Sequence, residues 1–254
     1  MKINRKELSK GQVVNHLRTN FIDDGVAIID NFLEKDVYKK INNLWTHKKY
    51  FKAQKQNDKL AYGNEFRHYF IKTLSSGAEV NMRDLNWPDK DEVYKCNFSE
   101  SSVIPKMKDV IVMINKLIKP IAESILGEPV NVGQCHANIY KKNGDNFSRA
   151  HSDGSSFHSL MGFILYMGKT DWKYDWGGLL HNLHPTTNEV ETILPVSNRL
   201  VFINHGLNLR HWITPVCKWA KEDRKTLVGM FEKINQWHYW DEDGNPIDKY
   251  GNKI

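Results

Sequence analysis

The chain has 254 residues, of which 40% are hydrophobic and 11% aromatic, and it includes eight tryptophans. This composition supplies a large buried core and excludes an intrinsically disordered protein. The formal net charge of +6 comes from scattered lysines rather than from an arginine-rich block. It permits an anionic substrate or a nucleic acid but requires neither.

The three cysteines are Cys96, Cys135 and Cys217, and no two of them form a C-x-x-C pair. An odd number without paired spacing argues against a disulfide framework and against a thiolate zinc site. The first residues, MKINRKELSKGQ, are not followed by the apolar segment of a secretory signal. The longest apolar run, VIVMINKLI, is too short to cross a bilayer. We therefore expect a soluble, cytoplasmic protein without a membrane partner.

In chain order, the first predicted element is a short buried strand, VAIID, that ends at Asp30. The apolar residues after it recur at helical spacing and predict an amphipathic helix over residues 34–47. These residues are Leu33, Val37, Ile41, Leu44 and Trp45. Residues 50–100 are charged, aromatic and turn-rich without a clean period, which predicts long loops suited to cover a site.

A second helix is predicted to begin near Pro105, which a first helical turn tolerates, after a cap at Ser101 or Ser102. Its apolar stripe consists of Met107, Val110, Ile111, Ile114, Leu117, Ile118 and Ile121. Gly127 is placed to end the helix. Pro120 lies inside the pattern and predicts a kink or a break.

From about residue 130, the sequence consists of short β-prone segments separated by Gly, Asn, Asp and Pro. The segments are NVGQCHANIY, HSLMGFILYMG, GGLLHNLH, EVETILPV, RLVFINHG, HWITPV and RKTLVGMFE. Their close spacing predicts a sandwich or a jelly-roll barrel. The predicted fold class is therefore mostly β with a helical N-terminal part (α+β), in which supporting helices pack on a jelly-roll core. The polar C-terminal end is expected to form a surface hairpin or a tail.

One stretch of this region, RAHSDGSS, contains His151 and Asp153 where a strand is expected to end in a turn. Residues i and i+2 of a strand point to the same face, so the two side chains can aim at one point. His211, in HWITPV, supplies a third group from a facing strand. Two histidines and a carboxylate that leave three octahedral positions open are the ligands of non-haem Fe(II) oxygenases. An isolated H-x-D also arises by chance, so the order of the later elements has to support this interpretation.

Arg224 follows His211 by thirteen residues and begins the segment RKTLVGMFE. An arginine that projects into a barrel needs an anionic partner, because a buried unpaired guanidinium is costly. The diacid 2-oxoglutarate meets this need, with its 2-oxo acid end on iron and its distal carboxylate at Arg224. The alternatives are a surface salt bridge from Arg224 to Glu222 or Asp223, and an inward-facing Lys225 in its place.

The motifs follow one order: H-x-D, WGGL at 176–179, RLVFIN at 199–204, H-x-x-x-P-V at 211–216, and R-x-x-L-x-x-x-F from Arg224. In this order, over about residues 130–235, the sequence resembles the 2-oxoglutarate/Fe(II)-dependent dioxygenase superfamily, prolyl 4-hydroxylase type. The segment IIDNFLEKDVYKKI is also similar to the opening strand and helix of that family. The resemblance implies a double-stranded β-helix (jelly-roll) core.

The resemblance also implies roles for individual residues. The implied iron ligands are His151, Asp153 and His211. The implied 2-oxoglutarate-binding residues are Arg224, Tyr166 and Tyr140, of which Arg224 and Tyr166 bind the distal carboxylate. Both tyrosines can also be explained as ordinary core aromatics. No catalytic residue is implied beyond the metal ligands. The implied cofactors are Fe(II), 2-oxoglutarate as cosubstrate and O2, with ascorbate to keep the iron reduced.

Three further residues have competing explanations. His205 lies six residues before His211, but the P-V that follows His211 matches the family, so His205 is better explained by a turn with Gly206. Trp176 and Trp212 are either walls of the pocket or core residues, and the second explanation is preferred.

The chain is expected to be one folded unit with three parts. These are a support region and substrate cover (1–128), the catalytic core (129–236) and a polar tail (237–254).

The resemblance implies hydroxylation of an unactivated C–H bond, foremost in a prolyl residue of a protein or peptide. A free amino acid or another small metabolite is the second candidate substrate. Nucleic acid is not expected as a partner, because the demethylase branch carries a second arginine where this chain has Met230. Two other classes stay open: a non-enzymatic jelly-roll binding module, and a zinc hydrolase, which would not need Arg224.

Overall fold

The structure is a computed structural model of the chain. The residues that it describes are 10–47, 51–55, 71–73, 79–81, 92–97, 105–143, 147–151, 153, 159–169, 171–184, 186–207, 209–234, 239–240 and 246–247. Within this part of the chain, no helix combines the length and the hydropathy that crossing a bilayer requires.

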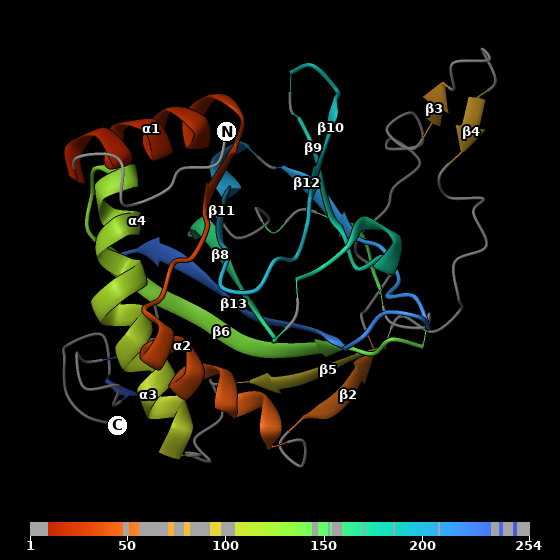
Figure 1. Ribbon diagram of the computed structural model, residues 1–254. Coiled ribbons are helices and arrows are strands. Elements are labelled where there is room, and N and C mark those ends of the chain that lie inside the picture. The colour runs from red at the N-terminus through yellow and green to blue at the C-terminus, as the bar shows by residue number, and fades with distance from the viewer. Residues whose placement is uncertain are drawn as a thin grey trace.

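Two antiparallel sheets form the centre of the molecule (Figure 1). The larger sheet contains β1 (Val26–Ile29), β2 (Lys52–Lys55), β5 (Glu92–Asn97), β6 (Val130–Tyr140), β8 (Ser159–Met167), β11 (Leu200–Asn204) and β13 (Arg224–Lys233). The smaller sheet contains β7 (Ser148–His151), β9 (Leu180–Leu183), β10 (Val190–Ile193) and β12 (Arg210–Ile213). The strand orders are β1-β11-β8-β13-β6-β5-β2 and β10-β9-β12-β7. This arrangement confirms the predicted jelly-roll core.

Two short strand pairs accompany the main sheets. One pair is β3 (Ile71–Thr73) with β4 (Glu79–Asn81), and the other is β14 (Tyr239–Trp240) with β15 (Pro246–Ile247). The second pair agrees with the hairpin that was one of the two expectations for the C-terminal end.

Helices cover the outer face of the larger sheet (Figure 1). They are α1 (Lys10–Asp23), α2 (Lys35–Asn42), α3 (Pro105–Met113) and α4 (Lys119–Leu126). A 3-10 turn, η1 (Asn43–Thr46), continues α2, and a π-helical turn, η5 (Ile114–Ile118), joins α3 to α4. The buried residues of α4 belong to the same apolar cluster as those of β6 and β13.

The predicted start, break and end of the second helix are confirmed. Pro105 begins α3, and Pro120 lies in the first turn of α4, directly after the π-helical turn. Proline lacks an N–H and its ring clashes with the preceding turn, so the regular helix cannot run through it. Gly127 ends α4 in the left-handed conformation, with φ of 78°. The predicted cap at Ser101 or Ser102 lies outside the described residues.

The alternation of side chains along the strands creates two separate cores. On β8, Leu165 faces the helices, whereas Ile164 and Tyr166 face the smaller sheet. On β11, Phe202 faces the helices and Ile203 faces the smaller sheet. Because neighbouring residues of a strand point to opposite faces, each strand contributes to both cores.

The seven β-prone segments and the strand VAIID are confirmed, and the N-terminal part differs from the sequence interpretation in three respects. The helix expected over 34–47 is α2, which ends at Asn42 and continues as a 3-10 turn. Helix α1 was not predicted. Residues 50–100 are not only loops, since β2 and β5 extend the larger sheet through the pairing of β5 with β6. These short strands depend on a long-range partner, which local periodicity does not reveal.

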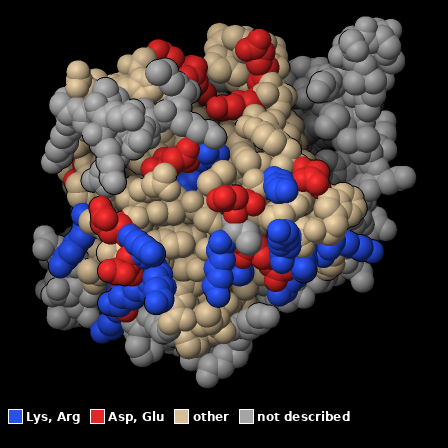
Figure 2. All heavy atoms as spheres, viewed as in Figure 1, with Lys and Arg blue, Asp and Glu red and all other residues tan. Residues whose placement is uncertain are grey.

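The charges visible on one face of the molecule are mixed in sign. In Figure 2, lysines and arginines in the lower half of the view have acidic side chains between them. The exposed pair of Lys40 and Asp109, 2.9 Å apart, belongs to the described part of the surface. Among the described residues on this face, the basic side chains therefore do not form a continuous stripe.

Candidate functional site

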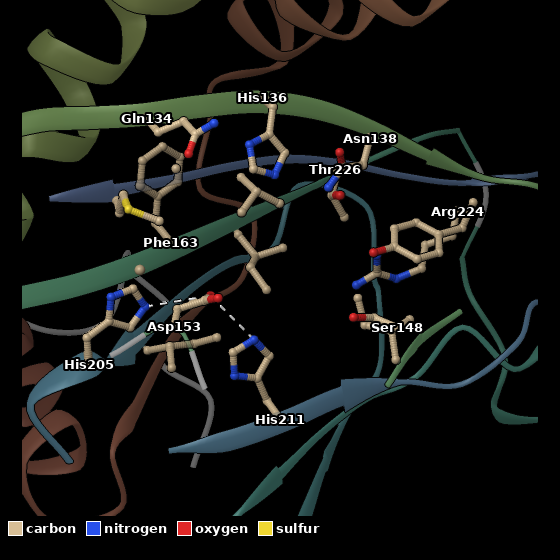
Figure 3. Close-up of a pocket in the computed structure, with 18 residues that line it drawn as sticks. Gln134, His136, Asn138, Ser148, Asp153, Phe163, His205, His211, Arg224 and Thr226 are labelled. Carbon is tan, nitrogen blue, oxygen red and sulfur yellow. Dashed lines mark ion pairs between the residues drawn. The ribbon is translucent and has the colours of Figure 1, made fainter. Parts of the chain in front are cut away.

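A cavity of about 220 Å³ lies between the two sheets. Figure 3 shows that side chains from both sheets point into it. On β6 the inward-facing residues are the even-numbered ones: Gln134, His136, Asn138 and Tyr140. The adjacent strand β13 contributes Arg224, Thr226, Val228 and Met230. Strand alternation thus places four consecutive inward positions of each strand on one wall.

Asp153 and His211 meet at one end of this cavity (Figure 3). The His211 Nε2 atom lies 3.5 Å from the Asp153 Oδ2 atom. The His211 ring is buried, and its Nδ1 lies 3.4 Å from the carbonyl oxygen of Leu209. A proton on Nδ1 that is directed at this carbonyl leaves Nε2 as the electron-pair donor on the cavity side. The pair is therefore suited to hold a metal ion.

The third predicted ligand, His151, is positioned by its backbone. It is the last residue of β7 and is paired with His211 across the antiparallel β7–β12 ladder. Directly opposite residues point to the same face of a sheet. Its side chain lies outside what the structure describes.

A test of the metal hypothesis is whether the donors present are sufficient. Among the described side chains, no three from His, Cys, Asp and Glu are arranged to hold a metal ion. Asp153 and His211 provide two donors of the types that Fe(II) accepts. A third donor would have to come from outside the described side chains, and His151, whose backbone is paired with His211, is the candidate that the sequence offers.

Arg224 lies at the opposite end of the cavity (Figure 3). Its side chain is 1% exposed and packs between two rings, with the guanidinium carbon 4.9 Å from the Tyr140 centroid and 5.1 Å from the Tyr166 centroid. Nη2 donates to the Tyr166 hydroxyl at 3.4 Å, and Nε has no hydrogen-bond partner among the described residues. The ion pairs among the described residues do not include Arg224. A buried cation in this state is costly unless an anion enters the cavity.

The alternatives for this position are settled by the neighbouring ion pairs. Asp223 pairs with Lys141 at 3.0 Å, and Glu222 pairs with Lys225 at 3.4 Å. Arg224 therefore does not form the surface salt bridge that was its alternative explanation. Lys225 faces away from the cavity, because β13 alternates and Arg224 occupies the inward position.

The two tyrosines at this end differ in how they contribute. Tyr140 lines the cavity, whereas Tyr166 is fully buried behind Arg224. Burial raises the pKa of the Tyr166 hydroxyl, and the charge of Arg224 lowers it by a smaller amount. The hydroxyl therefore stays protonated at neutral pH and can donate a hydrogen bond to an anion beside Arg224.

The WGGL motif packs closely against the side chain of Arg224. Gly178 has φ of 63°, and a Cβ atom there would lie 3.1 Å from Cδ of Arg224. A Cβ atom at Gly177 would lie 2.1 Å from the carbonyl oxygen of Pro215. The two glycines thus allow the loop to approach both the P-V segment and the stem of Arg224, and both adopt a backbone conformation that favours glycine.

The two tryptophans near the site belong to the core rather than to the cavity wall. Trp176 is buried in the apolar cluster between the sheets, and Trp212 stacks on His181 with 5.2 Å between ring centroids. Neither residue lines the cavity. This agrees with the more heavily weighted of their two explanations.

His205 is the residue whose role the sequence interpretation missed. It begins the 3-10 turn His205–Leu207, so the expected turn is present. Its side chain nevertheless points into the cavity, with Nε2 lying 3.9 Å from Oδ2 of Asp153 (Figure 3). The alternation of side chains along β11 could have predicted this direction, because Val201, Ile203 and His205 fall on one face of the strand.

Polar groups also line the rest of the cavity. Gln134 and His136 lie toward the Asp153 end, away from Arg224 (Figure 3). Nearer to Arg224, the side-chain oxygens of Asn138 and Thr226 are buried, and no described residue is their hydrogen-bond partner. Buried polar atoms of this kind are normally satisfied, so they are available to a polar ligand.

Comparisons with known proteins agree with this geometry. Residues 135–232 match the family model described as the 2OG-Fe(II) oxygenase superfamily. No curated protein matches the sequence.

Solved structures with a similar fold include two prolyl hydroxylases. One is a prolyl-4-hydroxylase from Pseudomonas putida, with 16% identity, a TM-score of 0.55, and coverage of 87% of this chain and 100% of that chain. The other, from Trichoplax adhaerens, is in complex with a hypoxia inducible factor peptide fragment, with 16% identity, a TM-score of 0.57, and coverage of 91% and 96%. The 2-oxoglutarate-dependent epimerase SnoN from nogalamycin biosynthesis is also similar, with 10% identity, a TM-score of 0.59, and coverage of 89% and 84%. At these identities the likeness concerns the fold.

Proposed function

We propose that the chain is a member of the 2OG-Fe(II) oxygenase superfamily, whose family model matches residues 135–232, and that it hydroxylates an unactivated C–H bond. The observation that carries the proposal is the cavity itself. It holds a carboxylate and an imidazole at one end, and a buried arginine without an ion pair among the described residues at the other. A dicarboxylate cosubstrate can connect these two ends.

In this proposal, His151, Asp153 and His211 hold the iron, and Arg224 binds the distal carboxylate of 2-oxoglutarate. Tyr166 adds a hydrogen bond to that carboxylate, and Tyr140 forms the wall beside it. The bound iron would couple decarboxylation of 2-oxoglutarate to succinate with transfer of one oxygen atom of O2 to the substrate. Ascorbate would keep the iron reduced between turnovers.

The first candidate substrate is a prolyl residue of a protein or peptide. It rests on the motif order that resembles the prolyl 4-hydroxylase type. Two similar structures are described as prolyl hydroxylases, and they support the substrate only by analogy of fold. A cytoplasmic location belongs to the same proposal and rests on the sequence.

A second candidate substrate, a free amino acid or another small polar metabolite, is favoured by the walls near Asp153. Gln134 and His136 point into the cavity there and offer neutral donors and acceptors. A prolyl ring is mostly apolar and needs few such groups. A small polar substrate could form hydrogen bonds with both side chains, because Gln134 is exposed in the cavity and His136 is partly buried there.

The primary experiment adds Fe(II) and then 2-oxoglutarate to the purified protein without O2 and records the visible charge-transfer band. Peptides that contain proline, and free amino acids, are then screened in the presence of O2 for succinate and for a +16 mass shift. Modified peptides support the first candidate substrate, and modified amino acids support the second. Activity with zinc in the absence of O2 would instead identify a hydrolase. Retention of a ligand without any turnover would identify a binding module.

Two variants and one control make this experiment specific. His211→Ala should abolish the band, and Arg224→Ala should retain iron but need more 2-oxoglutarate to produce the band. Lys225→Ala is the matched control, because Lys225 is adjacent to Arg224 but faces the opposite side of β13. If wild type gives no band, or if both active-site variants turn over normally, the proposed function is wrong.

A further inference from the structure

We propose that His205 is a positioning residue that orients the Asp153 carboxylate toward the metal. This inference rests on the proposed function and extends it to a histidine that none of the family motifs includes. The His205 side chain is buried at 5% exposure, and it lies across the cavity end from His211 (Figure 3). The two imidazoles approach the same Asp153 oxygen, Oδ2, at 3.9 Å and 3.5 Å.

The His205 ring is held from behind by Ser159. Its Nδ1 atom lies 2.5 Å from the Ser159 hydroxyl oxygen, and both residues are buried. A ring lone pair that faced the carboxylate would be repelled, so the proton of the neutral ring belongs on Nε2. Ser159 then donates to Nδ1, and His205 presents an N–H to Asp153.

Gly162 provides the space that this ring occupies. A Cβ atom at Gly162 would lie 2.5 Å from Nε2 of His205, closer than two such atoms can approach. The ring therefore lies directly against the backbone of β8. Because Ser159 and Gly162 both belong to β8, one strand fixes the ring by a hydrogen bond and by the absence of a side chain.

Distance and geometry distinguish positioning from ligation. Adjacent ligands of one octahedral ion, with bonds of about 2.1 Å, are about 3 Å apart. The 3.5 Å between His211 and Asp153 is closer to this value than the 3.9 Å between His205 and Asp153. The set of Asp153, His205 and His211 is also fully described, and it is not arranged to hold a metal ion. We therefore assign His205 to the carboxylate, across a gap that a small rotation of the carboxylate or one water molecule can close.

The experiment measures metal affinity rather than turnover. Apo protein is titrated with Fe(II) without O2, and binding is followed by calorimetry and then by the 2-oxoglutarate charge-transfer band. His205→Phe keeps the ring but removes both nitrogens, and it should weaken Fe(II) binding by about 10- to 100-fold, as loss of a group that orients a metal ligand does. His205→Gln can place an amide N–H near the position of Nε2 and should recover most of the affinity. Ser159→Ala should change affinity in the same direction as His205→Phe but by less.

His181→Phe is the matched control. His181 also has a hydroxyl partner, with Nδ1 lying 2.9 Å from Oγ1 of Thr192, but it does not line the cavity. This variant should bind Fe(II) like wild type, and thermal unfolding of every variant verifies that it is folded. If His205→Phe does not fold, Ser159→Ala and His205→Gln carry the test.

The outcomes separate the two proposals. If wild type binds no Fe(II), the proposed function fails, and the role of His205 fails with it. If wild type binds Fe(II) and His205→Phe binds it equally well, only the role of His205 is wrong. If His205→Phe and His205→Gln both lose all binding, as His211→Ala should, His205 is a direct ligand and the positioning role is overturned.

Discussion

The two faces of the larger sheet, built by the same strands, differ in almost every physical property. On β6, the residues that face the helices, such as Ala137 and Ile139, are apolar and buried in one continuous cluster. The residues between them, such as His136 and Asn138, are polar and line the cavity. On β13, Leu227 and Phe231 face the helices, whereas Arg224 and Thr226 face the cavity.

This contrast shows how one element serves stability and chemistry at the same time. The apolar face stabilises the fold in proportion to the area that it removes from water, about 25 cal/mol per Å². The polar face opposes folding, because a buried cation and unpaired side-chain oxygens have lost their water. The helix-covered face offsets this cost, so substitutions on the two faces should have separable effects.

The largest effect is expected at the cavity face, for the metal. His211→Ala removes one of the two described donors and should abolish detectable Fe(II) binding in anaerobic calorimetry. Thermal stability in the absence of metal should change little, because the variant also removes a buried polar ring. Fe(II) binding that is unchanged in this variant would contradict the assignment of this end of the cavity.

The opposite result is expected on the helix-covered face. Leu165→Ala creates a cavity at a fully buried position of β8 and should lower the free energy of unfolding by about 2–5 kcal/mol. Urea unfolding measures this change. Fe(II) affinity under native conditions should stay close to that of wild type. A large loss of affinity in the folded variant would mean that the two faces are coupled.

Arg224→Met should sharpen the contrast, because it separates function from stability at one residue. Methionine has a similar length without the charge, so the apo protein should be as stable as wild type or more stable. The dissociation constant for 2-oxoglutarate should rise by at least about tenfold, since a charge-assisted bond is lost. Lys225→Met should change neither quantity appreciably. A destabilised Arg224→Met variant would mean that the contacts of the guanidinium with Tyr140 and Tyr166 already offset the cost of burying its charge.

The smallest effect is expected from Tyr166→Phe. This change removes one hydroxyl that accepts a hydrogen bond from Arg224 at 3.4 Å. The affinity for 2-oxoglutarate should fall by about 2- to 10-fold, which corresponds to the typical net contribution of a single hydrogen bond. Titration of the charge-transfer band measures it. A change as large as that in Arg224→Met would mean that Tyr166 contributes as much to cosubstrate binding as Arg224 does.

The sequence alone predicted the strands of the jelly roll, the break at Pro120 and the helix end at Gly127. These features depend on local chemistry: strand periodicity, the missing N–H of proline and the left-handed conformation of glycine. The prediction failed where the partner is remote, as for β5, which forms a strand because β6 lies beside it. It also missed α1, in which Val13, Leu17 and Phe21 recur every four residues and pack into the apolar core.

For the site, the sequence by itself determined which residues are chemically able to hold a metal and a dicarboxylate, because residue type and order carry that information. Only the tertiary structure decided how they are used. It placed Arg224 against two tyrosine rings instead of against the adjacent acids. It also placed the side chain of His205, which begins a turn, beside Asp153. The physical reason is that burial and distance arise from strands far apart in the chain that pack together, and no local pattern records which of them will meet.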